Sequence, residues 1–317
     1  MTKKTKTLLM GTPEFAERIF RKFYSAMREN FDIVAVITAP DKPVGRKQEL
    51  IPSPVKKFAE ENKLKVLQPD KIRDSEWIEK IKQLRPDLII LCAYAQIIPK
   101  EILDIPKYGA LNIHPSFLPK YRGASPVHAA ILNGNEISGV TIMLMDEQLD
   151  HGPIIQNSKF KIQNSRITYK ELENQLIDVA VDLLIKTLPD YIDGKIKAQP
   201  QDHSKATFCK IIKKQDGKID WNKSAEEIER IIRAFHQWPT SYTFFNNKQL
   251  KILEADPSTS LGASKKLSEV FTENKQLAVQ TGKGILILKQ IQLEGKKPMS
   301  GQDFLNGHPK IIGSILQ

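Results

Sequence analysis

The stretch Leu88–Cys92, with the sequence LIILC, is an unbroken run of five apolar residues. Such a run is typical of a parallel strand that is covered by helices on both faces, whereas a strand with one wet face alternates polar and apolar residues. Thr7–Met10 and Asp32–Thr38 (DIVAVIT) have a similar apolar character. These three runs therefore predict neighbouring strands of a mostly parallel sheet.

Helix signals alternate with the predicted strands. A proline follows a hydroxyl residue, as at many helix starts, at Thr12-Pro13, Ser53-Pro54 and Ser125-Pro126. The alternation predicts an α/β fold with an open, mostly parallel Rossmann-like sheet. Ligands of such sheets bind beyond the carboxyl ends of the strands. We therefore expect the site in the loops that follow Met10, Thr38, Cys92 and Ile113.

The sequence pattern changes after the long amphipathic segment Thr168–Ile192. Residues 194–206 are polar and predict a linker between a catalytic domain at 1–193 and a smaller domain at 207–317. The smaller domain has short alternating segments that predict an all-β barrel, namely Ser241–Phe245, Leu250–Glu254, Gln276–Gln280 and Gly284–Gln292. The Ser- and Gly-rich stretch Pro257–Lys266 predicts a mobile loop.

The charge of the chain points to an anionic partner. The 317 residues carry a formal net charge of +11, and residues 207–317 alone hold 17 Lys and Arg against 11 Asp and Glu. This density favours a polyanion-binding role for the smaller domain, nucleic acid being the commonest large polyanion. A merely basic surface is the alternative that composition leaves open.

Several classes of protein are disfavoured by the sequence. The two cysteines, Cys92 and Cys209, have no spacing partner, which argues against a zinc cluster or a disulfide framework. The N-terminal apolar run Leu8–Met10 is too short for a signal peptide, and no run approaches the roughly 20 apolar residues of a membrane span. We therefore expect a cytoplasmic protein. The turn after Met10 lacks GxGxxG, which disfavours a nicotinamide dehydrogenase.

The most informative stretch is Asn112–Gly123, with the sequence NIHPSFLPKYRG. Asn112 and His114 are two residues apart at the end of a predicted strand, so their side chains face the same side. An amide can stabilise negative charge that develops on a carbonyl oxygen, and an imidazole can move a proton near neutral pH. A turn asparagine and a structural histidine are the alternative. The loop that follows, with Pro115, Pro119 and Gly123, favours the functional interpretation.

Two further loops have the composition of functional sites. Met145–Ile154 (MDEQLDHGPI) contains carboxylates that could orient His114, although this stretch taken alone favours a hydrophilic connecting loop. Pro40–Pro52 is far longer than the 2–6 residues that are usual between a strand and a helix. It carries Lys42, Arg46 and Lys47, which would suit a substrate that bears phosphates, whereas a solvated insertion is the alternative.

These motifs resemble those of the folate-dependent formyltransferases. The similar segments span the chain in order and are Met10–Ala16, Ala39–Lys56, Asn112–Pro126, Asp146–Ile154 and Gly295–Gly307. The long basic loop and the C-terminal segment narrow the resemblance to the formyltransferases that act on methionyl-tRNA. Phe117 stands where that family usually has a leucine, and the resemblance gives no role to His151.

The resemblance implies a catalytic trio of Asn112, His114 and Asp150. It also implies a tetrahydrofolate site lined by Ser116, Phe117, Leu118 and Pro119 and flanked by Cys92, Tyr94 and Ile97. Arg46, with Lys42 and Lys47, would approach the acceptor stem of initiator methionyl-tRNA, which an OB-like C-terminal barrel would help to hold. The implied donor is 10-formyltetrahydrofolate, no metal is implied, and we expect a monomer.

Three other functions stay open at this point. A related formyltransferase could act on glycinamide ribonucleotide or an amino sugar nucleotide, and it would share the trio without needing a basic barrel. A catalytically inactive RNA-binding protein on this fold is disfavoured by the intact trio. A nucleotide-dependent dehydrogenase is disfavoured by the missing glycine fingerprint.

Overall fold

The computed structural model describes residues 4–44, 48–259 and 265–317, and these divide into two compact units. Unit 1 comprises residues up to 123, 137–160 and 173–209, and unit 2 comprises 124–136, 161–172 and 210–317. Each unit therefore takes up segments that are distant in the sequence. The boundaries at 193 and 207 that we placed from the sequence stay a prediction.

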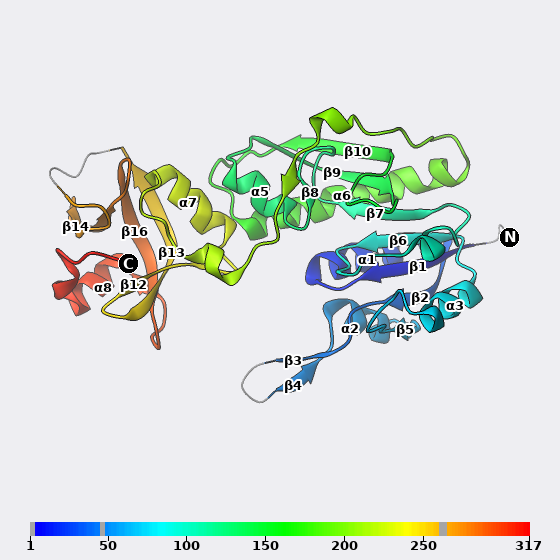
Figure 1. The fold of residues 1–317 in the computed structure, drawn as a ribbon, viewed down its shortest axis with the longest axis horizontal. Helices are drawn as coiled ribbons and strands as arrows, with labels where there is room; N and C mark the ends of the chain where they lie inside the picture. The colour runs from blue at the N-terminus through cyan, green and yellow to red at the C-terminus, as the bar shows by residue number, and fades with distance from the viewer. Residues whose placement is uncertain (1–3, 45–47, 260–264) are drawn as a thin grey trace. The chain divides into compact units, whose positions relative to one another are not determined.

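Unit 1 is built on a seven-stranded sheet with the order β10-β9-β7-β6-β1-β2-β5 (Figure 1). The pairs β7–β6, β6–β1, β1–β2 and β2–β5 are parallel, and β9 runs antiparallel to β7. The strands are β1 (Thr5–Gly11), β2 (Phe31–Ile37), β5 (Val66–Leu67), β6 (Leu88–Cys92), β7 (Ala110–His114), β9 (Ile137–Leu144) and β10 (Ile154–Lys161). All five side chains of β6 are buried, as its unbroken apolar run requires. The open, mostly parallel α/β sheet is thereby confirmed.

Helices connect these strands at most of the predicted places. They are α1 (Glu14–Met27), α2 (Pro54–Glu61), α3 (Ser75–Leu84), α4 (Lys100–Leu103) and α6 (Tyr169–Ile192), the last of which begins in unit 2. The Ser53 hydroxyl caps α2 by accepting a hydrogen bond of 3.0 Å from the Lys56 N–H, as expected. The hydroxyl cap predicted at Thr12-Pro13 is not formed. Pro13 is itself the N-cap of α1, and Thr12 Oγ1 instead accepts a hydrogen bond from the Ala39 N–H.

The segment Pro40–Pro52, which we expected to be a long loop without structure, contains a short hairpin. Its antiparallel strands are β3 (Lys42–Val44) and β4 (Glu49–Ile51). At the base of the hairpin, Asp41 accepts hydrogen bonds from the Lys56 ammonium group at 2.5 Å and from the Gln68 amide at 2.8 Å. The same bonds hold the pKa of the Asp41 carboxyl below its ordinary value, with the one from Lys56 having the larger effect.

Unit 2 contains an antiparallel sheet with the order β12-β13-β16-β15-β14, and β17 pairs with β16. The strands are β12 (Ser241–Phe245), β13 (Lys248–Ser258), β14 (Val270–Glu273), β15 (Gln276–Gln280), β16 (Ile285–Leu293) and β17 (Met299–Ser300). The C-terminal segment joins the two edges, because Gln317 exchanges backbone hydrogen bonds with Phe244 of β12 while the Ser314 carbonyl accepts from the Val270 N–H of β14. The sheet thus closes, in agreement with the predicted barrel.

Several helices belong to unit 2. They are α5 (Pro126–Leu132), η2 (Lys214–Gly217), α7 (Ala225–Ala234), α8 (Gly301–Gly307) and η3 (Pro309–Ile311). The barrel interior and α7 share one apolar core, which includes Ile228, Leu250, Leu286 and Phe304. Pro257 and Ser258 belong to β13, so the predicted start of the mobile loop Pro257–Lys266 is wrong by at least two residues. Positions 260–264 of this loop lie outside the described residues. In the described chain, no helix is long and apolar enough to cross a membrane.

Candidate active site

The carboxyl ends of neighbouring parallel strands meet at one edge of the unit 1 sheet. Gly11 at the end of β1 pairs with Cys92 at the end of β6, and Leu91 pairs with Asn112 of β7. Asn112 and His114 are 9% and 4% exposed, and they face the same side of β7 because side chains alternate along a strand. The sheet thus presents an amide and an imidazole where ligands of this fold class bind.

Asp150 reaches both side chains from the loop between β9 and β10. Its Oδ1 atom accepts a hydrogen bond of 3.2 Å from Asn112 Nδ2, and its Oδ2 atom lies 3.6 Å from His114 Nδ1. Oδ2 also accepts a hydrogen bond of 2.7 Å from the backbone N–H of Gly123. The structure therefore brings Asn112, His114 and Asp150 into one cluster, as the sequence-based hypothesis requires.

The second nitrogen of His114 lies 2.9 Å from the backbone carbonyl of Tyr121. A carbonyl only accepts, so His114 Nε2 carries the proton in this bond. His114 Nδ1 then faces the Asp150 carboxylate, and a ring that takes up a second proton there gains an ionic partner. The cluster can therefore accept a proton and hold the resulting positive charge beside a negative one.

Comparison with known proteins identifies the family of the chain. Residues 3–188 match the model of the formyl transferase family, and residues 211–309 match the model of the formyl transferase C-terminal domain. The chain belongs to the formyl transferase family. Two of its relatives are the methionyl-tRNA formyltransferases of Clostridium novyi and Bacillus subtilis, which are 41% and 38% identical and match over 98% of this chain and 100% and 98% of their own.

Solved structures share the formyltransferase fold at lower identity. The sugar 3N-formyl transferase WlaRD, crystallised with dTDP and 5-N-formyl-THF, is 23% identical with a TM-score of 0.64, over 93% of this chain and all of that one. HypX from Aquifex aeolicus in complex with tetrahydrofolic acid is 17% identical with a TM-score of 0.66, over 98% of this chain and 48% of that one. Identities this low establish the common fold alone.

The formyltransferase loop Ser116–Pro119, predicted to line the folate site, is held by side chains of unit 1. The Ser116 hydroxyl donates to the Lys120 carbonyl at 2.6 Å, and Thr141 Oγ1 joins the loop by donating to the Ser116 carbonyl and accepting from the Leu118 N–H. The side chains of Ser116 and Leu118 are buried, whereas Phe117 and Pro119 keep accessible surface. Phe117 and Pro119 are therefore the residues of this loop with surface that a ligand can reach, and the role of the loop in folate binding stays a prediction.

The predicted folate residues after β6 fall into different environments. Cys92 is fully buried, and burial raises the pKa of its thiol. Ile97 is 87% exposed, a high value for so apolar a side chain and one that a ligand could lower. Among the described residues, the buried Tyr94 hydroxyl has no hydrogen-bond partner. The part of these three residues in folate binding therefore stays a prediction.

The predicted RNA-contacting residues are only partly described. Lys42 lies exposed on β3, whereas Arg46 and Lys47 lie outside the described residues. No group of three or more His, Cys, Asp or Glu side chains in the described ranges is arranged to hold a metal ion.

Sequence reasoning missed three groups that support the cluster. The Tyr121 carbonyl and the Gly123 N–H are backbone groups and carry no sequence signal of their own. Gln201, which lies in the segment predicted as a linker, is 5% exposed and donates to the Asp150 carbonyl at 2.9 Å. A buried glutamine in a polar stretch of sequence cannot be told from an exposed one without the fold.

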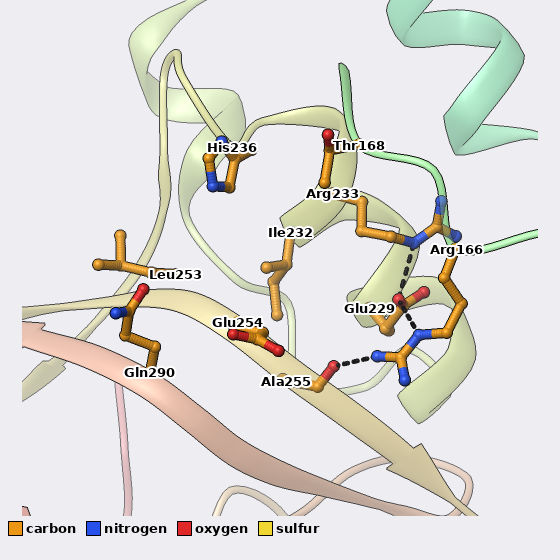
Figure 2. Close-up of a pocket in the computed structure, with 10 residues that line it drawn as sticks. All are labelled: Arg166, Thr168, Glu229, Ile232, Arg233, His236, Leu253, Glu254, Ala255 and Gln290. Atoms are coloured by element: carbon orange, nitrogen blue, oxygen red, sulfur yellow. Dashed lines mark hydrogen bonds and ion pairs between the residues drawn. The ribbon is translucent and has the colours of Figure 1, made fainter. Parts of the chain in front are cut away.

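Unit 2 contains a separate cleft, which Figure 2 shows. Its lining residues are Arg166, Thr168, Glu229, Ile232, Arg233, His236, Leu253, Glu254, Ala255 and Gln290. The buried Glu229 carboxylate accepts from Arg233 Nε at 2.7 Å and from Arg166 Nε at 3.3 Å (Figure 2). This acid is neutralised by two arginines of its own unit, so we interpret the group as a structural ion-pair network.

Proposed function

We propose that this chain transfers the formyl group of 10-formyltetrahydrofolate to the α-amino group of methionyl-tRNA, which yields formylmethionyl-tRNA for translation initiation. The observation that carries the proposal is the 41% identity to a methionyl-tRNA formyltransferase over 98% of this chain, both family domains included. The sugar and HypX proteins are related at only 17–23% identity. Another small-amine formyltransferase is therefore the weaker alternative.

Catalysis begins with attack of the neutral amine on the formyl carbon. A free α-amino group has a pKa near 8, so a useful fraction is neutral at physiological pH without a strong base. The new C–N bond places negative charge on the formyl oxygen. Asn112 Nδ2 has two hydrogens and directs one of them to Asp150, so the other is free to stabilise this oxygen.

The amine must also lose a proton before the leaving nitrogen departs. Asp150 is the most accessible member of the trio, with 11% of its side chain exposed against 5% for His114. The carboxylate takes the proton from the attacking amine and shares it with the His114 ring. The bond between the formyl carbon and the donor nitrogen then breaks, and the proton passes to that nitrogen. No covalent intermediate on the enzyme is needed.

The basic residues of the chain would bind the phosphates of the RNA substrate. The hairpin β3–β4 carries Lys42 exposed on its first strand, with Arg46 and Lys47 in the connection between the strands. Cationic side chains on such an arm would neutralise phosphates of the acceptor stem. The barrel of unit 2 would hold another part of the tRNA. A monomer is sufficient for this arrangement, and size-exclusion chromatography with light scattering tests it.

The decisive experiment is a formyl-transfer assay with 10-formyltetrahydrofolate as donor. Methionyl-tRNA, glycinamide ribonucleotide and an amino sugar nucleotide are offered separately. Formylation of methionyl-tRNA alone supports the proposal. Formylation of only a small amine would keep the trio and overturn the assignment of tRNA as the substrate.

A further inference from the structure

Two histidines without a part in the chemistry above stack beside the catalytic carboxylate. The ring centroids of His151 and His203 lie 4.0 Å apart, and their planes differ by 1°. His151 follows Asp150 in the chain, and His203 begins the short helix η1 (His203–Lys205). Through this stack, His203 packs on the residue that follows Asp150 in the chain.

The hydrogen bonds of the two rings differ in kind. His151 Nδ1 lies 2.6 Å from Oδ2 of Asp146, a carboxylate oxygen that accepts a hydrogen bond from the ring. His203 Nδ1 lies 2.8 Å from an Arg122 guanidinium nitrogen, which can only donate. His203 Nδ1 must therefore carry a lone pair, and this ring is neutral while the bond to Arg122 is present.

Arg122 connects His203 to the backbone around Asp150. Its guanidinium is buried and donates to the Gln201 side-chain oxygen at 2.7 and 3.2 Å. The Gln201 amide nitrogen donates in turn to the carbonyls of Asp150 at 2.9 Å and Gly152 at 2.7 Å. The residue after Arg122 is Gly123, whose N–H binds the Asp150 carboxylate. The dipeptide Arg122-Gly123 thus supports Asp150 in two ways. The Gly123 backbone binds its carboxylate, and the Arg122 side chain acts on its backbone through Gln201.

We propose that His203 is a positioning residue for formyl transfer, because its neutral ring holds Arg122 where Arg122 and Gln201 can fix Asp150. The proposal rests on the catalytic role assigned to Asp150 under the proposed function. A proton on His203 Nδ1 removes the acceptor for Arg122 and places a cation against the guanidinium. The support for Asp150 then loosens, so acid lowers the rate of transfer while the substrates still bind.

The charged groups that face His203 allow this response. Arg122 on β8 (Arg122–Gly123) and the pair His151–Asp146 lie on other elements. On its own turn, Asp202 is engaged by Lys205 at 2.6 Å and by the Ser204 hydroxyl at 2.6 Å. Asp202 is therefore already paired, and the acceptor bond to Arg122 is the interaction that a proton on Nδ1 would replace.

The test compares two variants of the full-length enzyme across pH 5.5–8, with kcat and both KM values measured. His203→Gln keeps a neutral oxygen that can accept from Arg122, so it should retain the kcat at pH 7.5 and keep more of it at pH 5.5–6 than the unaltered enzyme does. His203→Lys places a permanent cation at this point and should lower kcat about 100-fold at every pH, with little change in either KM. Lys197→Gln removes one positive charge from an exposed lysine that has no part in the Arg122 bond or in the pairing of Asp202, and it should follow the unaltered profile.

An unaltered acid limb in His203→Gln, or an unaltered kcat in His203→Lys, would overturn the proposal. The comparison is run with whichever amine the enzyme formylates, so a wrong RNA substrate does not affect it. Nitrogen NMR of the imidazole rings, assigned with His203→Gln, gives a readout that does not depend on activity. A protonated His203 Nδ1 at pH 7.5 would contradict the proposed acceptor role, whereas an unprotonated one supports it.

Discussion

The backbone N–H of Gly123 donates a hydrogen bond of 2.7 Å to Oδ2 of Asp150, although 27 residues separate the two in the chain. Gly123 has a φ of +113°, and a Cβ at this position would lie 2.5 Å from the Cys209 carbonyl oxygen. Cys209 belongs to β11 (Phe208–Cys209), which pairs with Gly123 in a small parallel sheet. Only glycine therefore lets the backbone approach β11 and still direct its N–H at the carboxylate.

The substitution Gly123→Ala tests this relationship. The added methyl group must push β11 away and turn the N–H from Asp150, so kcat should fall about 100-fold. Gly194→Ala is the matched control, because Gly194 also has a positive φ of +76° but no atom lies within 4 Å of its Cβ position. The control should lose about 1–2 kcal/mol in the free energy of unfolding, measured in urea, and keep its kcat. Equal kcat values in the two variants would contradict the role of Gly123.

Asn112→Ala removes the amide proposed to stabilise the formyl oxygen. Loss of one donor to a developing oxyanion typically lowers kcat about 100- to 1000-fold, with a smaller effect on the KM for the donor. Steady-state kinetics with both substrates measures this. Asn133→Ala, at the C-cap of α5, removes an asparagine whose amide binds the Ala129 carbonyl of its own helix, so it controls for loss of a side-chain amide. A kcat within twofold of the unaltered enzyme would exclude Asn112 from the chemistry.

Lys42→Ala and Arg46→Ala test the basic arm. Each should raise the KM for methionyl-tRNA and leave the KM for 10-formyltetrahydrofolate unchanged, because phosphate contacts act on the RNA substrate only. Each lost contact should also reduce the slope of log affinity against log salt concentration by about one. Lys65→Ala, an exposed lysine just before β5, is the control. If neither variant differs from Lys65→Ala, the hairpin is an insertion without a part in RNA binding.

Buried His128 in α5 should make the protein less stable in acid. Burial lowers the pKa of His128 from its ordinary value of 6.5 to about 4, while a hydrogen bond to the Trp238 backbone acts in the opposite direction. Between these two values the unfolded chain binds a proton that the folded chain does not. The free energy of unfolding should therefore fall as the pH drops from 7 toward 4, by roughly 3 kcal/mol from this residue over the full window.

Urea unfolding at pH 7 and pH 5 measures this effect of His128. His128→Gln should lose stability at pH 7, through missing contacts with the Tyr169 ring, yet show a weaker dependence on pH. The exposed His236 provides the control, since His236→Gln should keep the full dependence. A dependence that is equal in His128→Gln and His236→Gln would show that His128 is not its source.

The sequence by itself determined the elements and much of the arrangement of unit 1. Unbroken apolar runs such as Leu88–Cys92 and proline-marked helix starts such as Ser53-Pro54 are local signals, and each has a local physical cause. The same is true of Asn112 and His114, whose spacing on a strand fixes their common face. The family motifs added Asp150 to this pair. Its place beside them needed the fold, which brings the loop after β9 back to the end of β7.

Only the tertiary structure decided the surroundings of Asp150 and the closure of the barrel. The Gly123 N–H and the Tyr121 carbonyl belong to the backbone, so no side-chain pattern announces them. Gln201 lies 51 residues beyond Asp150 in the chain, and nothing local shows that it is buried. The C-terminal segment joins β12 and β14 by backbone hydrogen bonds over long sequence distances. Such contacts depend on where the whole chain has folded, whereas strands and helices follow from neighbours a few residues away.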